Sequence, residues 1–167
     1  MRYTACRTLR AINDRLAAAA RAAVVIAVVV MLAALAAQVV MRYVFGMALS
    51  WSEELALLLF TWVVLLMSAI GVREGFHVRM DLLADRLPPL PRRLIELAIQ
   101  AGVVAAGLFL CWQGGRYLFE TRGSVSAAIA YPIELLHFAA PVGGLLITAF
   151  AIERLLDPLP PAKKEPE

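Results

Sequence analysis

Few side chains of this 167-residue protein have the chemistry of a catalytic or metal site. The two histidines, His77 and His137, could ligate haem iron, and the two cysteines, Cys6 and Cys111, could form a disulfide or bind a metal. Cys6 lies near the N-terminus and Cys111 lies inside a long apolar stretch, so we expect two unpaired thiols. The sequence has no glycine-rich phosphate loop, no His-Glu-x-x-His motif and no Gly-x-Ser-x-Gly motif. We therefore predict that the protein is not an enzyme and that it holds no cofactor or metal ion.

Two adjacent acidic residues, Glu53 and Glu54, are the remaining polar candidates. Ser50 and Glu53 have the spacing of a capping box, which predicts that a helix begins at this point. Acidic side chains in the first turn also interact favourably with the helix dipole. One cap requires only one acid, however. A polar contact with a partner subunit is therefore the second interpretation of the pair.

The elements that position these side chains are four stretches without Asp, Glu, Lys or Arg. Hydrophobic residues make up 62% of the sequence and charged residues 17%. Each stretch is long enough for a helix that crosses the hydrocarbon core of a bilayer. The sequence therefore predicts an all-α integral membrane four-helix bundle, and it excludes a soluble domain, a disordered chain and a nucleic-acid-binding protein. We expect spans at residues 22–41, 55–72, 97–115 and 135–152, within a single membrane domain 1–158 followed by a polar tail 159–167.

Lys and Arg are distributed unevenly among the segments between the spans. Thirteen of them lie in residues 1–21, 73–96 and 153–167, and three lie in residues 42–54 and 116–134. The positive-inside rule then predicts that both termini and the middle loop are cytoplasmic. The two loops on the other side are too short to fold as domains, so recognition of a solute there requires another chain. The two histidines would lie on opposite sides of the membrane, which excludes a haem held by both.

Two charged segments have the helical spacing of amphipathic surface helices. In the first, Leu9, Ile12 and Leu16 alternate with charged residues ahead of the first span. A cleaved signal peptide is the alternative for this segment, but its apolar stretch is longer than an h-region of about 7–15 residues. We expect a retained anchor. The second segment, His77–Leu87, is expected to lie along the cytoplasmic surface between the second and third spans and to end at Pro88.

Small residues recur every four positions in the last two spans. Membrane helices associate through close backbone packing at such residues, so we expect both stripes to lie at helix–helix contacts. Pro141 is expected to kink the fourth span. The stripes are Ala98, Gly102 and Ala106 in the third span and Ala140, Gly144 and Thr148 in the fourth.

Several motifs taken together resemble the small, DctQ-like membrane subunit of tripartite ATP-independent periplasmic (TRAP) transporters. The resemblance is specific over residues 42–88, where the motif pieces occur in order. Elsewhere it is limited to four spans and the overall length. The pieces are Arg42–Gly46, Leu49–Glu54, Trp62, Arg73–Leu83 and Arg86–Pro88.

The resemblance implies a scaffold subunit of a sodium-coupled importer of organic acids, such as C4-dicarboxylates or sialic acids, in the bacterial inner membrane. The implied partners are a large elevator-type membrane subunit that holds the sodium and substrate sites, a soluble periplasmic solute-binding protein, and membrane lipid. The small subunit has no substrate site of its own. The positions that match the family's motifs, expected at partner interfaces or in structural roles, are Arg42, Trp51, Glu53, Glu54, Trp62, Arg73, His77 and Asp81.

An independent small channel or exporter is the alternative function. Such a protein needs a polar path through the bilayer. The polar residues in the spans are scattered and form no single stripe, which favours the scaffold interpretation. These residues are Gln38, Thr61, Ser68, Gln100, Gln113 and Thr148.

Overall fold

A computed structural model describes residues 2–47, 49–75 and 89–156 of the chain. This part of the protein is helical apart from short connections and one isolated antiparallel bridge, between Val125 and Pro132. The all-α prediction is therefore confirmed. The helices are α1 (Arg2–Phe45), α2 (Ser50–Glu74), α4 (Pro89–Glu120), α5 (Glu134–His137) and α6 (Ala139–Leu156).

Four helical segments are long and apolar enough to cross a membrane. The four charge-free stretches of the sequence lie within them. The fourth segment consists of α5 and α6, which are interrupted at the single residue Phe138. Pro141 is the third residue of α6, where it lacks an N–H for the carbonyl of His137. The expected irregularity is therefore found three residues before the proline.

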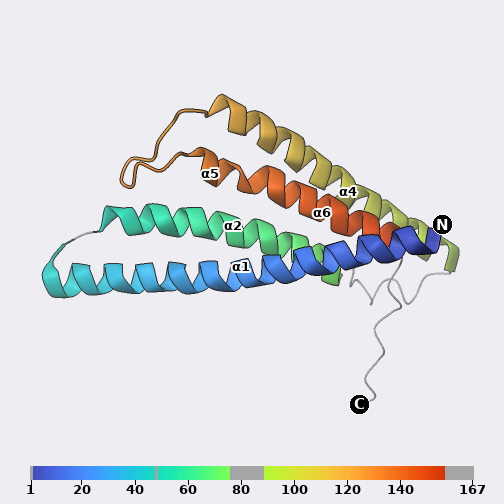
Figure 1. The fold of residues 1–167 in the computed structure, drawn as a ribbon, viewed down its shortest axis with the longest axis horizontal. Coiled ribbons are helices and arrows are strands. Elements are labelled where there is room, and N and C mark those ends of the chain that lie inside the picture. The colour runs from blue at the N-terminus through green and yellow to red at the C-terminus, as the bar shows by residue number, and fades with distance from the viewer. Residues whose placement is uncertain (1, 48, 76–88, 157–167) are drawn as a thin grey trace, which may run out of the picture.

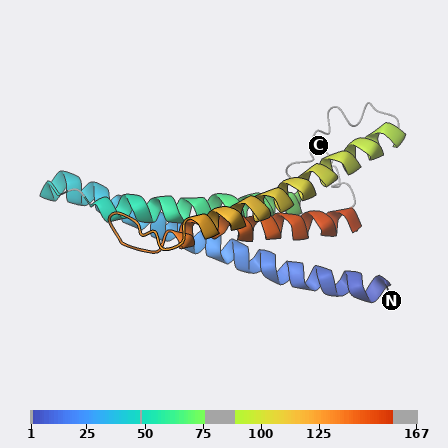
Figure 2. The same cartoon turned by 90° about the horizontal axis from the view of Figure 1, so that it is seen from above.

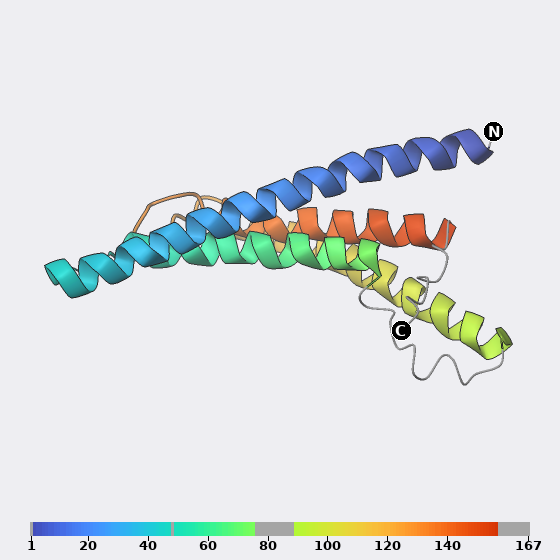
Figure 3. The same cartoon turned by 90° about the horizontal axis from the view of Figure 1, so that it is seen from below.

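The helices form two antiparallel hairpins that pack side by side. α1 lies along α2, and α4 lies along α6 (Figure 1). α2 and α6 form the central pair, and α1 and α4 lie on the outside (Figure 2). The first turns of α1 and α4 diverge from the central pair on opposite sides (Figure 3). We use "loop end" for the end of the molecule that contains the α1–α2 connection and the loop of residues 121–133.

The core consists mainly of small apolar side chains where α1, α2 and α6 meet. Phe150 of α6 is fully buried together with Ala17 of α1 and Ala69 of α2. Nearer the loop end, Val24 of α1 packs with Leu66 of α2. Alanine lets helix backbones approach closely, which matters in a bilayer because lipid provides little hydrophobic drive for helices to associate.

The N-terminal segment is continuous with the first span. α1 runs for 44 residues, a length of about 66 Å, and the structure shows no separate surface helix. The residues that pack inward are Asn13 and Ala17, which are 3% and 1% exposed. The apolar residues Ile12 and Leu16 face outward instead, at 53% and 41% exposure. The helical spacing was recognised correctly, and the face that packs against the other helices is the small and polar one.

The predicted small-residue stripe of α6 lies at a helix contact, but the predicted stripe of α4 does not pack against the other helices of the chain. A Cβ added at Gly144 would lie 2.6 Å from the backbone N of Cys111 and 2.7 Å from the backbone O of Gly107. The α4 surface at this crossing therefore includes Gly107, and Gly114 contacts Ala140 in the same way. A Cβ at Gly102 would meet no atom within 4 Å. The expected contact stripe on α4 was wrong because it lies on the exposed face of that helix.

The helix boundaries near the loop end differ in one respect from those predicted. α1 ends at Phe45, and Gly46 follows with a φ of +68°, as expected for a glycine stop. α2 begins at Ser50, but its N-cap residue is Leu49, and no side chain caps the helix. The hydroxyl of Ser52 donates to the carbonyl of Leu49 at 2.7 Å. The capping-box prediction was wrong because Ser50 is already inside the helix.

Some predictions concern residues outside the described part of the chain. These are the amphipathic segment His77–Leu87, with His77 and Asp81, and the tail 159–167.

Candidate functional site at the loop end

The loop of residues 121–133 is a short hairpin. The backbone N–H of Ser126 donates to the carbonyl of Tyr131, and that of Ile133 donates to the carbonyl of Ser124. These pairs leave residues 127–130 as a four-residue turn at the tip. Ala130 has a φ of +59°, a left-handed conformation that is uncommon for residues other than glycine. Such a conformation costs about 1–3 kcal/mol and persists only where neighbouring contacts hold it.

Glu54 of α2 binds the tip of this hairpin. Its two carboxylate oxygens accept hydrogen bonds from the backbone N–H groups of Ala128, at 2.8 Å, and Ile129, at 3.0 Å. These are the two central residues of the turn, whose N–H groups have no partner within a hairpin ladder. Two successive N–H groups that converge on one anion form a recurrent anion-binding arrangement of the backbone. Glu54 therefore supplies from another helix the acceptors that the turn lacks.

Tyr131 is the ionisable residue of the loop nearest to this contact. Partial burial, and then the negative charge of Glu54, raise the pKa of its phenol. The phenol therefore remains neutral at physiological pH and adds no second charge beside Glu54.

Both ends of the loop are also held by side chains. At its start, the N–H of Gly123 donates to the Glu134 carboxylate at 3.0 Å. The hydroxyl of Thr121 donates to the carbonyl of Tyr117 at 2.9 Å and lies 2.8 Å from Nδ1 of His137. Because the single hydroxyl proton is used on the carbonyl, Nδ1 of His137 is the donor to Thr121. His137 thus anchors the loop, and its ring also contacts Tyr117 edge-on, with centroids 4.4 Å apart.

Trp62 of α2 holds the exit of the loop. Its indole N–H donates to the carbonyl of Leu135 at 3.0 Å, and its ring lies beside Phe138 with centroids 6.4 Å apart. The bond satisfies the polar group of a tryptophan that is otherwise surrounded by apolar helices. Trp62 and Glu54 are therefore two ties from α2 to the segment that joins α4 to α6.

Glu53 has a different partner from its neighbour. Its carboxylate accepts a hydrogen bond from the Gln38 side chain of α1 at 2.7 Å. Glu53 thus closes the α1–α2 hairpin, whereas Glu54 joins that hairpin to the other one. Arg42 and Trp51, the other two sequence candidates at this end, have exposed side chains.

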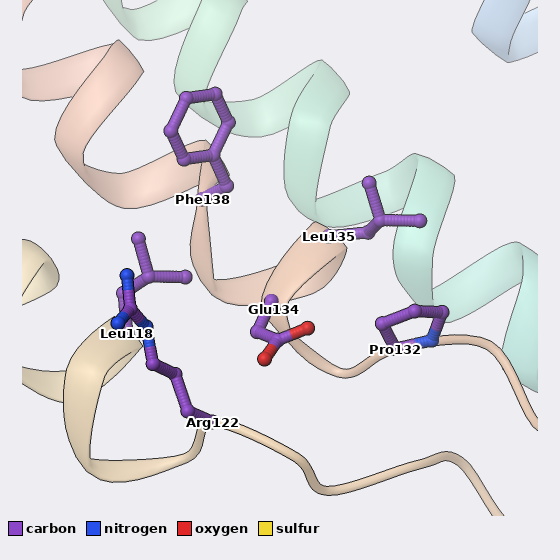
Figure 4. Close-up of a pocket in the computed structure, with 6 residues that line it drawn as sticks. All are labelled: Leu118, Arg122, Pro132, Glu134, Leu135 and Phe138. Carbon is purple, nitrogen blue, oxygen red and sulfur yellow. The ribbon is translucent and has the colours of Figure 1, made fainter.

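The side of the loop end carries a shallow depression of about 420 Å³ between α4 and α5. Figure 4 shows Glu134 between Arg122 on one side and Pro132 on the other, with apolar side chains completing the wall. The Arg122 guanidinium lies 4.4 Å from the centroid of the Phe119 ring, a cation–π arrangement. The lining residues are Leu118, Arg122, Pro132, Glu134, Leu135 and Phe138.

At the opposite end of the molecule, Arg73 joins three helices. Its guanidinium pairs with Asp14 of α1 and lies 3.8 Å from the Glu153 carboxylate of α6. It also lies 5.5 Å from the centroid of the Phe150 ring. Glu153 accepts a further hydrogen bond from Asn13 at 2.7 Å. Arg73, one of the motif positions, is therefore in contact with residues of its own chain.

The polar residues in the spans do not mark a path through the described bundle. Hydroxyl groups of Thr61, Ser68 and Thr148 donate to the carbonyl four residues earlier in their own helices. Such bonds satisfy a hydroxyl locally in a membrane helix. Within the described ranges, no three His, Cys, Asp or Glu side chains are grouped as metal ligands would be. The contacts at both ends hold the helices and the loop of this chain in place.

One known protein family matches most of the sequence of this chain. The family model for tripartite ATP-independent periplasmic transporters, DctQ component, matches residues 31–160. This chain belongs to that family.

Individual relatives agree with the DctQ assignment. The C4-dicarboxylate TRAP transporter small permease protein DctQ of Rhodobacter capsulatus is 33% identical over 117 residues, which are 68% of this chain and 51% of the relative. The chain thus matches about half the length of that relative. A putative TRAP transporter small permease protein of Haemophilus influenzae is 29% identical over 71% of this chain and 73% of its own. The sialic acid TRAP transporter permease protein SiaT of Haemophilus influenzae is 38% identical over 68% of this chain, but the match covers only 18% of that longer protein.

The candidate positions that the family resemblance suggested divide between the two ends of the bundle. Glu53, Glu54 and Trp62 make contacts at the loop end, and Arg73 does so at the opposite end. The contact of Glu54 with Ala128, 74 residues away, was not predicted from the sequence. Neither was the bond between His137 and Thr121. No pattern in a single sequence marks a bond from a side chain to a distant backbone group.

Proposed function

We propose that this protein is the small, static membrane subunit of a TRAP importer. Membership of the DctQ family supports this proposal. The importer would be secondary-active and sodium-coupled, and its solute an organic acid of the C4-dicarboxylate or sialic acid class, as the names of the relatives suggest. Similar small subunits occur with different solutes, which fits a chain without a substrate site of its own.

The exposed faces of the outer helices are the structural observation that favours a partner. Only 6% of the apolar window of α4 and 11% of that of α1 is buried within the chain. These faces must be covered by lipid or by another membrane protein. We infer that a large membrane subunit covers part of them, so that the bundle extends the immobile part of that subunit while its transport domain moves.

The distribution of Lys and Arg supports an orientation for the bundle in the bacterial inner membrane. With both termini in the cytoplasm, the loop end faces the periplasm. The hairpin of residues 121–133 is then available to help dock the soluble solute-binding protein. The charged segments 2–21 and 77–87 would lie near the cytoplasmic lipid surface, and residues 1–158 would form one membrane domain.

Reconstitution into liposomes tests the proposed function. The chain alone is expected to give no uptake of a C4-dicarboxylate or sialic acid under a sodium gradient. The chain together with its large subunit and the binding protein is expected to give uptake that disappears when a sodium ionophore collapses the gradient. Omission of this chain should abolish uptake. Solute flux through the chain alone would instead support the independent channel or exporter.

A further inference from the structure

The tip of the 121–133 hairpin depends on a residue outside the loop. The turn leaves the N–H groups of Ala128 and Ile129 without partners in the loop, and Glu54 accepts from both. The next residue, Ala130, is in the left-handed region, where alanine is disfavoured. Without the carboxylate, water would bind the two N–H groups, and the backbone at Ala130 could relax to a negative φ. The carboxylate therefore selects one conformation of the tip.

The contact cannot be explained as a feature of α2 alone. Both oxygens of Glu54 bind the loop, and α2 has no side-chain cap. The adjacent Glu53 binds α1 instead, so the two acids have separate tasks. Hydrogen bonds to a charged acceptor are roughly twice as strong as neutral ones. Glu54 is thus the connection through which the first hairpin holds the tip of the loop between α4 and α5.

The held tip presents an apolar surface. Val125 is 60% exposed and Ile129 is 39% exposed, and residues 123–131 contain no charged side chain. The tip lies beyond the ends of α4 and α5 and alongside the start of α2, and the α1–α2 connection extends further than the tip (Figure 1). The exposed Val125 and Ile129 side chains are open to a partner. An uncharged apolar tip fits an apolar patch on a folded protein. A loop already held in its bound conformation loses less entropy on docking.

We propose that Glu54 is a positioning residue that holds the tip of residues 127–130 in the conformation that docks the soluble solute-binding protein. This inference rests on the proposed function, since it assigns a residue to the docking step. Glu54 itself does not contact the solute. Its carboxylate faces the backbone of its own chain, and the side chains of the tip make the contact.

The test uses the complete reconstituted transporter with Glu54→Gln, with Glu54→Asp as a second variant and Glu53→Gln as the matched control. Glutamine keeps the size of the side chain but can accept from only one of the two N–H groups, and aspartate keeps the charge but is one methylene shorter. The first readout is the rate of tryptic cleavage after Arg122, an exposed site in the loop. The second is the concentration of binding protein at half-maximal uptake, measured separately from uptake at saturation.

Loss of the charged acceptor is expected to speed cleavage after Arg122 by about three- to tenfold. The half-saturating concentration of binding protein should rise by about the same factor, with uptake at saturation unchanged. Glu53→Gln should change neither value. Cleavage at the wild-type rate in both Glu54 variants would show that the carboxylate does not hold the tip. Faster cleavage with unchanged half-saturation would show that the held tip does not serve docking. If the wild-type complex fails to transport, the proposed function fails, and the cleavage rates still report on the contact.

Discussion

Replacement of Gly144 with leucine is expected to separate α4 from α6. At this crossing even a Cβ would lie 2.6 Å from a backbone atom of Cys111 and 2.7 Å from one of Gly107. Backbone atoms of a helix cannot move aside as a flexible side chain can. Overpacking of this kind costs about 1–3 kcal/mol and occasionally more. We expect the apparent melting temperature of the purified protein in detergent to fall by about 5 °C or more.

Gly102→Leu is the matched control on the same pair of helices. Gly102 lies on the exposed face of α4, where an added Cβ would meet no atom within 4 Å. The substitution should leave the melting temperature of the isolated chain within about 2 °C, because an exposed position away from special features usually changes stability by less than about 0.5 kcal/mol. Equal effects at the two glycines would contradict the assignment of the α4–α6 contact.

Replacement of Arg73 with glutamine is expected to loosen the end of the bundle opposite the loops. The Arg73 and Glu153 side chains are each 16% exposed. Loss of the arginine therefore leaves a partly buried Glu153 carboxylate that, among the described residues, still accepts a hydrogen bond from Asn13. Removal of one member of a fully buried pair costs about 3–5 kcal/mol. Because Asp14 is exposed, we expect the free energy of unfolding to fall by only about 1–3 kcal/mol. This fall should be seen as a lower melting temperature.

Arg21→Gln provides the comparison for Arg73. Arg21 pairs with Glu74 at 2.8 Å, but the two side chains are 55% and 37% exposed. Exposed ion pairs contribute about 0–1 kcal/mol to stability, so the melting temperature of this variant should fall much less than that of Arg73→Gln. Raising the salt concentration should diminish the Arg21 effect more than the Arg73 effect, because salt screens exposed charges more strongly. A larger loss at Arg21 would show that the burial of the Arg73 cluster does not determine its contribution.

The arrangement of long helices was predictable because the signal is strong and local. Four long stretches have no charged residues, and the charged residues lie between them. In a bilayer, an apolar stretch of this length can satisfy its backbone hydrogen bonds only as a helix or in a closed barrel. The glycine at position 46 ended a helix for an equally local reason, its access to positive φ. These two predictions needed only the chemistry of one segment.

The helix faces and their partners were harder to predict. Ala98 and Gly102 form as regular a series as Gly107 and Gly114, and only the packing of α6 shows which face of α4 is covered. The charged residues around Ile12 suggested a surface helix, but they do not show that Asn13 on the opposite face bonds to Glu153 of α6. The face that a helix buries depends on which other helix packs against it, and the sequence of the first helix alone does not show this.

Glu53 and Glu54 show that a sequence can indicate where contacts occur without indicating their partners. The Ser50–Glu53 spacing pointed to the correct place in the chain for a helix start, and the second acid suggested a contact with a partner subunit. The observed partner of Glu54 is the tip of a loop in the same chain. Both interpretations of the pair thus omitted the contact that the structure contains.

Affinity purification of the tagged chain from its native membrane in mild detergent, with mass spectrometry of the recovered proteins, tests the central claim most directly. If a partner covers the outer helices, one large polytopic membrane protein should be recovered together with the chain in a constant molar ratio. Gly144→Leu should reduce that recovery, because it distorts the bundle that the partner contacts. Recovery of the chain alone or as a homo-oligomer, from membranes shown to contain the large permease, would contradict the account.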